Sequence, residues 1–121
     1  MVVILGIANW IALEHHLYFS YRWFDIPMHF LGGIWLSFCF LWYYYTYQQP
    51  GLRRTVQEVF AIALSGTLTV ALLWELFEYL VNFYIILNAY DVLDTIKDLV
   101  IGMAGGLTGA TIFYEKKYYK P

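Results

Sequence analysis

The sequence predicts an all-α integral membrane protein, a four-helix bundle in which short loops make consecutive helices antiparallel neighbours. Hydrophobic residues make up 61% of the 121 residues, above the roughly 45–50% of soluble domains, and only 13% are charged. Four apolar stretches qualify as membrane helices, which need roughly 20 residues to cross a bilayer. Little sequence separates these stretches, so we expect a single transmembrane domain over residues 1–121.

The four stretches can be placed in order along the chain. The expected spans cover about residues 2–17, 26–45, 57–87 and 92–114. The first is apolar until Glu14 and lacks the basic start and cleavage pattern of a signal peptide, so we count it as a retained span. The break at Gln49-Pro50-Gly51 separates the second and third spans. The third span continues past Glu75 and Glu78.

Basic residues predict the orientation. Five of the seven lie between the second and third spans or after the fourth, at Arg53, Arg54, Lys116, Lys117 and Lys120. In a four-span protein these two segments share one side, which the positive-inside rule makes cytoplasmic. We therefore expect a multi-pass protein of the plasma (inner) membrane with both termini in the cytoplasm.

Composition and motifs also exclude several functional classes. Seven basic residues and a net charge of -2 do not suit a nucleic-acid binder, and Cys39 has no second cysteine with which to form a disulfide. The patterns of serine hydrolases, P-loop nucleotide binders and zinc proteases are absent from the sequence.

The acidic residues are concentrated in what this topology makes the outer half of the protein. Asp25 and His29 are four residues apart, Glu75 and Glu78 are three apart, and Asp94 and Asp98 are four apart, so each pair shares a helix face. The stripe of Asp98 continues as Gly102, Gly105 and Gly109, and small residues favour close helix packing. We therefore expect these acids to point into the bundle, where ionisable residues are usually functional. The candidate metal ligands are His29, Glu75, Glu78, Asp94, Asp98 and Asp25.

Some of these residues also have simpler interpretations. Asp25, two residues before Pro27, could cap the second span, and Asp91 could cap the fourth. Glu14, His15 and His16 fit a solvated outer boundary, from which one histidine could join the cluster. Lys97 fits a snorkelling or ion-paired residue.

Three segments, residues 23–33, 71–80 and 90–106, resemble the YjdF-like family of small bacterial inner-membrane proteins. They carry an Asp-x3-His-Phe-x2-Gly segment, a Glu-x2-Glu pair and an Asp-x2-Asp-x3-Asp run that enters a glycine-rich helix. The matching positions are Asp25, His29, Phe30, Gly33, Glu75, Glu78, Asp91, Asp94, Asp98 and Gly105. The layout is more distantly similar to that of VanZ-like proteins. The resemblance implies the membrane fold and the polar cluster, and it supplies no activity.

The leading functional hypothesis is a divalent cation site. Carboxylates with an imidazole suit Mg²⁺, Mn²⁺, Ca²⁺, Fe²⁺ or Zn²⁺, and such an ion could activate water against a lipid-linked substrate at the outer leaflet. A proton- or cation-coupled transporter and an accessory subunit with a purely structural polar cluster are the alternatives, and whether the protein is an enzyme is left open. Membrane lipid is the expected partner, with a homo-oligomer or another membrane protein as further alternatives.

Overall fold

The computed structural model describes residues 2–15, 22–48, 55–86 and 91–116. It contains the helices α1 (Val2–Glu14), α3 (Asp25–Tyr43), α4 (Val56–Val81) and α5 (Val92–Glu115). A 3₁₀ turn precedes α3, and wider π-helical turns extend α3 to Gln48 and α4 to Ile86. The described part of the chain is therefore helical almost throughout.

Three helices, and not four, are long and apolar enough to cross a membrane among the described residues. They are Asp25–Gln48, Val56–Tyr84 and Val92–Glu115. The expected four-helix bundle of membrane spans is therefore wrong. Helix α1 has 13 residues and a length of about 20 Å at 1.5 Å per residue, against a hydrocarbon core of about 30 Å. The physical reason is that the first apolar stretch ends at Glu14, too early to complete a span.

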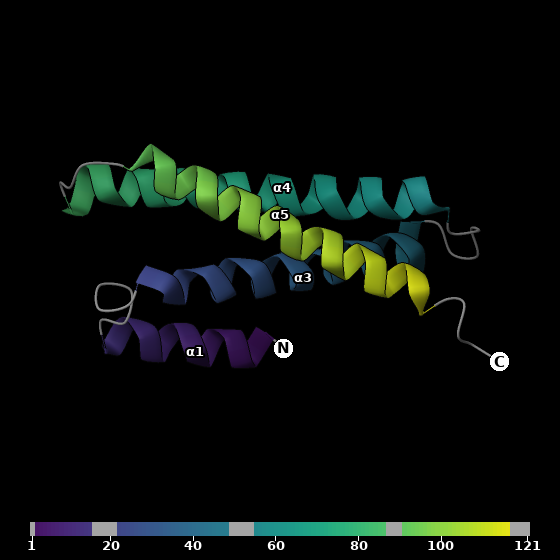
Figure 1. Ribbon diagram of the computed structural model, residues 1–121, viewed down its shortest axis with the longest axis horizontal. Helices are drawn as coiled ribbons and strands as arrows, with labels where there is room; N and C mark the ends of the chain where they lie inside the picture. Colours follow the sequence, from purple (N-terminus) through teal and green to yellow (C-terminus); the bar gives the residue numbers. More distant parts are fainter. Residues whose placement is uncertain (1, 16–21, 49–54, 87–90, 117–121) are drawn as a thin grey trace.

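The three spans pack side by side, and α5 contacts both α3 and α4 (Figure 1). Helices α3 and α5 begin at one end of the bundle, where α4 ends, and we call this the polar end. Helix α1 runs beside α3 near this end (Figure 1). Three crossings put the start of α3 and the end of α5 at opposite ends. The expectation that both termini share one side depended on a fourth span, and it does not follow from three.

The starts of α4 and α5 are capped by side chains. Thr55 accepts a hydrogen bond from the Glu58 backbone N–H, and the Glu58 side chain accepts one from the Thr55 backbone N–H, which forms a capping box. Asp91 accepts from the backbone N–H groups of Leu93 and Asp94, so its expected capping role is confirmed. Helix α3 instead follows Phe24, without a side-chain cap. The Asp25 carboxylate is therefore not used for capping.

Glycines bring α3 and α5 into backbone contact. A Cβ at Gly33 would collide with the carbonyl oxygen of Gly102, and one at Gly105 would collide with the carbonyl oxygen of Phe30. The expected inward stripe of Gly102, Gly105 and Gly109 is confirmed, since all three residues are buried. On α3 the contact is made by Gly33, whereas Gly32 has no atom within 4 Å of where its Cβ would lie.

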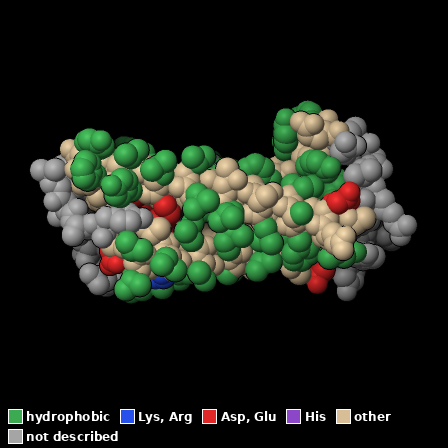
Figure 2. All heavy atoms as spheres, turned by 90° about the horizontal axis from the view of Figure 1, so that it is seen from above, with side chains coloured by type: hydrophobic (Ala, Val, Ile, Leu, Met, Phe, Trp, Pro, Cys, Tyr) green, Lys and Arg blue, Asp and Glu red, His purple; other side chains and the backbone are tan. Residues whose placement is uncertain are grey.

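The other end of the bundle is closed by an apolar core. Leu41, Val59, Ala63 and Ala110 are fully buried there, and Tyr45 stacks on Phe113. Large apolar side chains are exposed along the spans, as expected for surfaces that face lipid. Figure 2 shows these hydrophobic side chains over the middle of the visible face, with charged side chains toward the two ends.

Candidate functional site

Two helices bring an imidazole and two carboxylates together at the polar end. His29 Nε2 lies 3.2 Å from Asp25 Oδ1 and 3.8 Å from Asp98 Oδ2. One ligand atom from each of the three residues lies within 4.8 Å of the other two. Asp25 and His29 occupy successive turns of α3, and Asp98 comes from α5. We call this group the Asp25–His29–Asp98 cluster.

The glycine contact explains why the two helices meet here. The carbonyl oxygen of His29 lies 3.8 Å from where a Cβ on Gly102 would be, one turn beyond Asp98 on α5. Gly33 and Gly102 have no side chains to hold the backbones apart, so the His29 and Asp98 side chains can touch across the interface. This close contact between α3 and α5 at Gly33 and Gly102, which we call the glycine seam, thus positions the cluster.

Asp98 is the most enclosed member of the cluster. The residue is 3% exposed, and its Oδ1 atom is buried without a hydrogen-bond partner. The side chains of His29 and Asp25 are 17% and 22% exposed. Burial of a carboxylate is costly unless a positive charge compensates it, and the Lys97 ammonium lies 3.4 Å from this oxygen. The other carboxylate oxygen, Oδ2, faces His29.

Lys97 lies among three carboxylates at this end of the bundle. Its Nζ contacts Asp94 at 2.5 Å, Asp98 Oδ1 at 3.4 Å and Asp25 Oδ2 at 3.7 Å. The ion-paired interpretation of Lys97 is thus confirmed. Three carboxylates against one ammonium leave a formal charge of -2 when His29 is neutral, which one divalent cation would neutralise.

Asp94 therefore stands apart from the expected ligand set. Its side chain is 56% exposed, and it pairs with Lys97 three residues along α5. That spacing is visible in the sequence, and it is the signal by which Asp94 could have been assigned to Lys97 instead of to the cluster.

The two glutamates approach the cluster from α4. Glu75 is 6% exposed and lies within hydrogen-bonding reach of the Thr95 side chain on α5. Glu78 accepts a hydrogen bond of 3.0 Å from Trp74 Nε1. Both carboxylates are near enough to interact electrostatically with His29. The three ligand atoms that converge, however, come from Asp25, His29 and Asp98.

Other residues considered from the sequence are elsewhere or undescribed. Glu14 accepts a hydrogen bond from Trp10 on exposed α1. His16, Arg53, Arg54, Lys117 and Lys120 lie outside the described residues.

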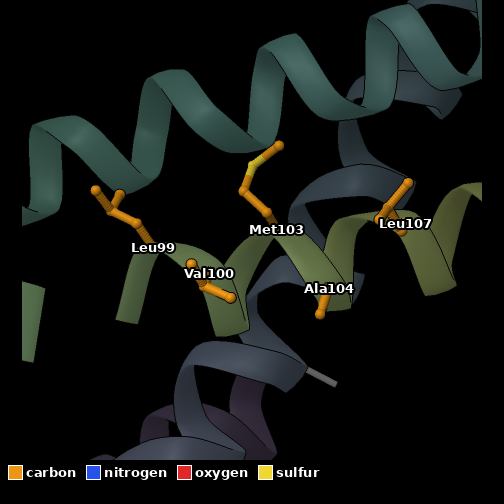
Figure 3. Close-up of a pocket in the computed structure, with 5 residues that line it drawn as sticks. All are labelled: Leu99, Val100, Met103, Ala104 and Leu107. Atoms are coloured by element: carbon orange, nitrogen blue, oxygen red, sulfur yellow. The ribbon is translucent and has the colours of Figure 1, made fainter. Parts of the chain in front are cut away.

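A shallow apolar groove lies on α5, separate from the cluster. It has a volume of about 390 Å³ and is lined by Leu99, Val100, Met103, Ala104 and Leu107. Figure 3 shows Leu99, Met103 and Leu107 pointing toward α4, with Val100 and Ala104 on the other side of the helix. None of these lining residues is ionisable, so the groove takes no part in the chemistry of the cluster.

Comparison with known proteins assigns the chain to a family. The profile of a family described as "Predicted membrane protein (DUF2238)" matches residues 2–117. This match fits the resemblance to YjdF-like membrane proteins. No curated protein and no solved structure matches the chain. Because the match covers nearly the whole length, the chain belongs to the predicted membrane protein family DUF2238.

Proposed function

We propose that this membrane protein binds a divalent cation through Asp25, His29 and Asp98. The observation that carries the proposal is the convergence of three ligand atoms, from two helices, within 4.8 Å of one another. Two ligands of one ion are separated by at most twice the bond length, about 4.2 Å for Zn²⁺ and about 4.8 Å for Ca²⁺. The distances of 3.2 and 3.8 Å from His29 Nε2 fit within these limits.

Charge and burial support the same proposal. The formal charge of -2 around Lys97 matches one divalent ion, and Asp98 is a buried carboxylate whose Oδ2 faces His29. Carboxylates and one imidazole are hard or borderline ligands, which favour Mg²⁺, Mn²⁺, Ca²⁺, Fe²⁺ or Zn²⁺. Water would complete the coordination, because three protein atoms are fewer than these ions take.

A chemical use for the ion follows from its place in the membrane. A divalent ion lowers the pKa of a bound water and polarises phosphate or carbonyl oxygens. At the polar end of the spans, such an ion would meet lipid headgroups. We propose hydrolysis of a lipid-linked substrate as the reaction class. We further propose that the protein lies in the inner membrane with Arg53, Arg54 and the end of α5 on the cytoplasmic side.

Transport through the bundle is the weaker alternative. Beyond the glycine seam, the buried core of the described residues consists of apolar side chains and the hydroxyl groups of Ser37, Thr67 and Tyr45, and it contains no buried carboxylate or imidazole. A translocated ion needs ligands along its whole path, since an unpaired charge in hydrocarbon costs several kcal/mol. The described core therefore favours a site that opens at one end.

Metal titration of the purified protein tests the proposal. Electron paramagnetic resonance is expected to detect Mn²⁺ binding by the wild type. The affinity is expected to fall at least about tenfold in Asp98→Asn, because loss of a residue that only orients a metal ligand already lowers metal affinity by about 10–100-fold. Glu115→Gln removes one charge from the exposed far end of the same helix and is the matched control. Equal Mn²⁺ binding by the two variants would refute the site.

A further inference from the structure

The contacts of Lys97 divide the oxygens of the two cluster carboxylates. Asp25 turns Oδ1 toward His29 and Oδ2 toward Lys97 Nζ, at 3.2 and 3.7 Å. Asp98 turns Oδ2 toward His29 and Oδ1 toward Lys97 Nζ, at 3.8 and 3.4 Å. Each carboxylate thus offers one oxygen to the side of His29, where the cation would lie, and the other to the ammonium.

We propose that Lys97 determines which divalent cation the site accepts, by holding Asp25 and Asp98 to one ligand oxygen each. This inference rests on the proposed function of the Asp25–His29–Asp98 cluster. With Lys97 in place, the protein offers three ligand atoms. Without it, both carboxylates can bind through two oxygens, and the protein offers five.

The number of protein ligands separates Ca²⁺ from the smaller ions. Ca²⁺ takes six to eight oxygen ligands and uses bidentate carboxylates, whereas Mg²⁺ keeps several waters and needs one or two protein carboxylates. Zn²⁺ is satisfied by three protein ligands and a water. A site restricted by Lys97 therefore favours small divalent ions, and release of the restriction favours Ca²⁺ most.

Lys97 also lowers the affinity of the site for every cation. Its ammonium is tethered beside the two carboxylates and therefore has a high effective concentration there. A cation from solution must compete with this ammonium for the carboxylate oxygens. A monovalent ion has no charge advantage over the ammonium, but a divalent ion attracts each carboxylate twice as strongly. Lys97 thereby excludes monovalent ions.

Asp94 keeps Lys97 near the site when a cation binds. It lies one turn before Lys97 on α5, is 56% exposed, and makes the shortest of the three Lys97 contacts. When a cation occupies the oxygens of Asp25 and Asp98, the Lys97 ammonium can shift toward Asp94 and keep that ion pair. Asp94 is therefore a positioning residue that acts through Lys97.

Competition between Mn²⁺ and Ca²⁺ tests the role of Lys97. Dissociation constants for both ions are measured on the purified wild type, Lys97→Met, Lys97→Gln and Lys97→Arg, with Lys116→Met as a control at the far end of α5. Removal of the ammonium is expected to strengthen Ca²⁺ binding at least about tenfold, or about 1.4 kcal/mol, and Mn²⁺ binding by less. Lys97→Arg keeps the charge and is expected to keep the preference of the wild type for Mn²⁺.

The outcomes separate this inference from the proposed function. If both ions bind, and Asp98→Asn weakens them, but Lys97→Met and Lys97→Gln leave the Mn²⁺/Ca²⁺ ratio unchanged, the role of Lys97 is wrong and the site stands. Equal strengthening of both ions is also a refutation, because it reports a simple charge effect. If neither ion binds to the wild type or to any Lys97 variant, the cation site itself is wrong.

Discussion

Adjacent glycines on α3 give the sharpest test of how the bundle packs. A Cβ at Gly33 would overlap the Gly102 carbonyl oxygen and would lie 3.0 Å from the Gly106 backbone nitrogen. These are backbone atoms that no side-chain rotation can move, so Gly33→Ala must push α3 and α5 apart. The same substitution at Gly32 meets nothing within 4 Å. Gly32→Ala is therefore a control on the same helix, one residue away.

The size of the difference can be worked out from this comparison. Both alanines gain about 1 kcal/mol of helix propensity over glycine, so that gain cancels between the two variants. Overpacking a close interface costs about 1–3 kcal/mol. Gly33→Ala is expected to be less stable than Gly32→Ala by that amount. It is also expected to weaken Mn²⁺ binding, because the displacement moves His29 away from Asp98.

Reversible unfolding by denaturing detergent, followed by circular dichroism, measures the difference in free energy for each variant. Mn²⁺ titration of the folded variants measures the effect on the cluster. The close-packed seam would be refuted if Gly33→Ala were as stable as Gly32→Ala. If Gly33→Ala were less stable but bound Mn²⁺ as the wild type does, the seam would be correct and its role in positioning His29 would be wrong.

Three further predictions concern the cation, the caps and the topology. A chelator is expected to lower the melting temperature of the metal-loaded wild type but not of Asp98→Asn, because an ion at 100 times its Kd stabilises the folded state by about 2.7 kcal/mol. If the chelator leaves the melting temperature of the wild type unchanged and acid raises it, the carboxylates share protons instead of binding an ion. Thr55→Ala is expected to cost about 1 kcal/mol of stability in detergent unfolding, through loss of the α4 cap, and an unchanged midpoint would contradict the capping box. A reporter fused after Pro121 is expected to give a cytoplasmic signal, and a periplasmic signal would reverse the orientation.

The positions of the long helices could be predicted because each depends on local sequence. The expected second, third and fourth spans differ from the observed helical segments by only a few residues at their ends. The first apolar stretch was wrongly counted as a span, since apolar composition alone does not supply the length that a crossing requires. The cap at Asp91 and the ion pairing of Lys97 were also foreseen, because both involve neighbours within one helical turn.

The sequence by itself determined that the chain is a helical membrane protein, and which polar side chains share a helix face. Helical periodicity is sufficient for this, because residues three or four apart lie together whatever surrounds them. The tertiary structure alone decided which of six candidate ligands meet. Contact between Gly33 and Gly102 brings Asp98 to His29, while Lys97 pairs with Asp94 at the exposed edge. Such choices depend on the distance and rotation between helices, which are properties of the packed interface and not of either helix alone.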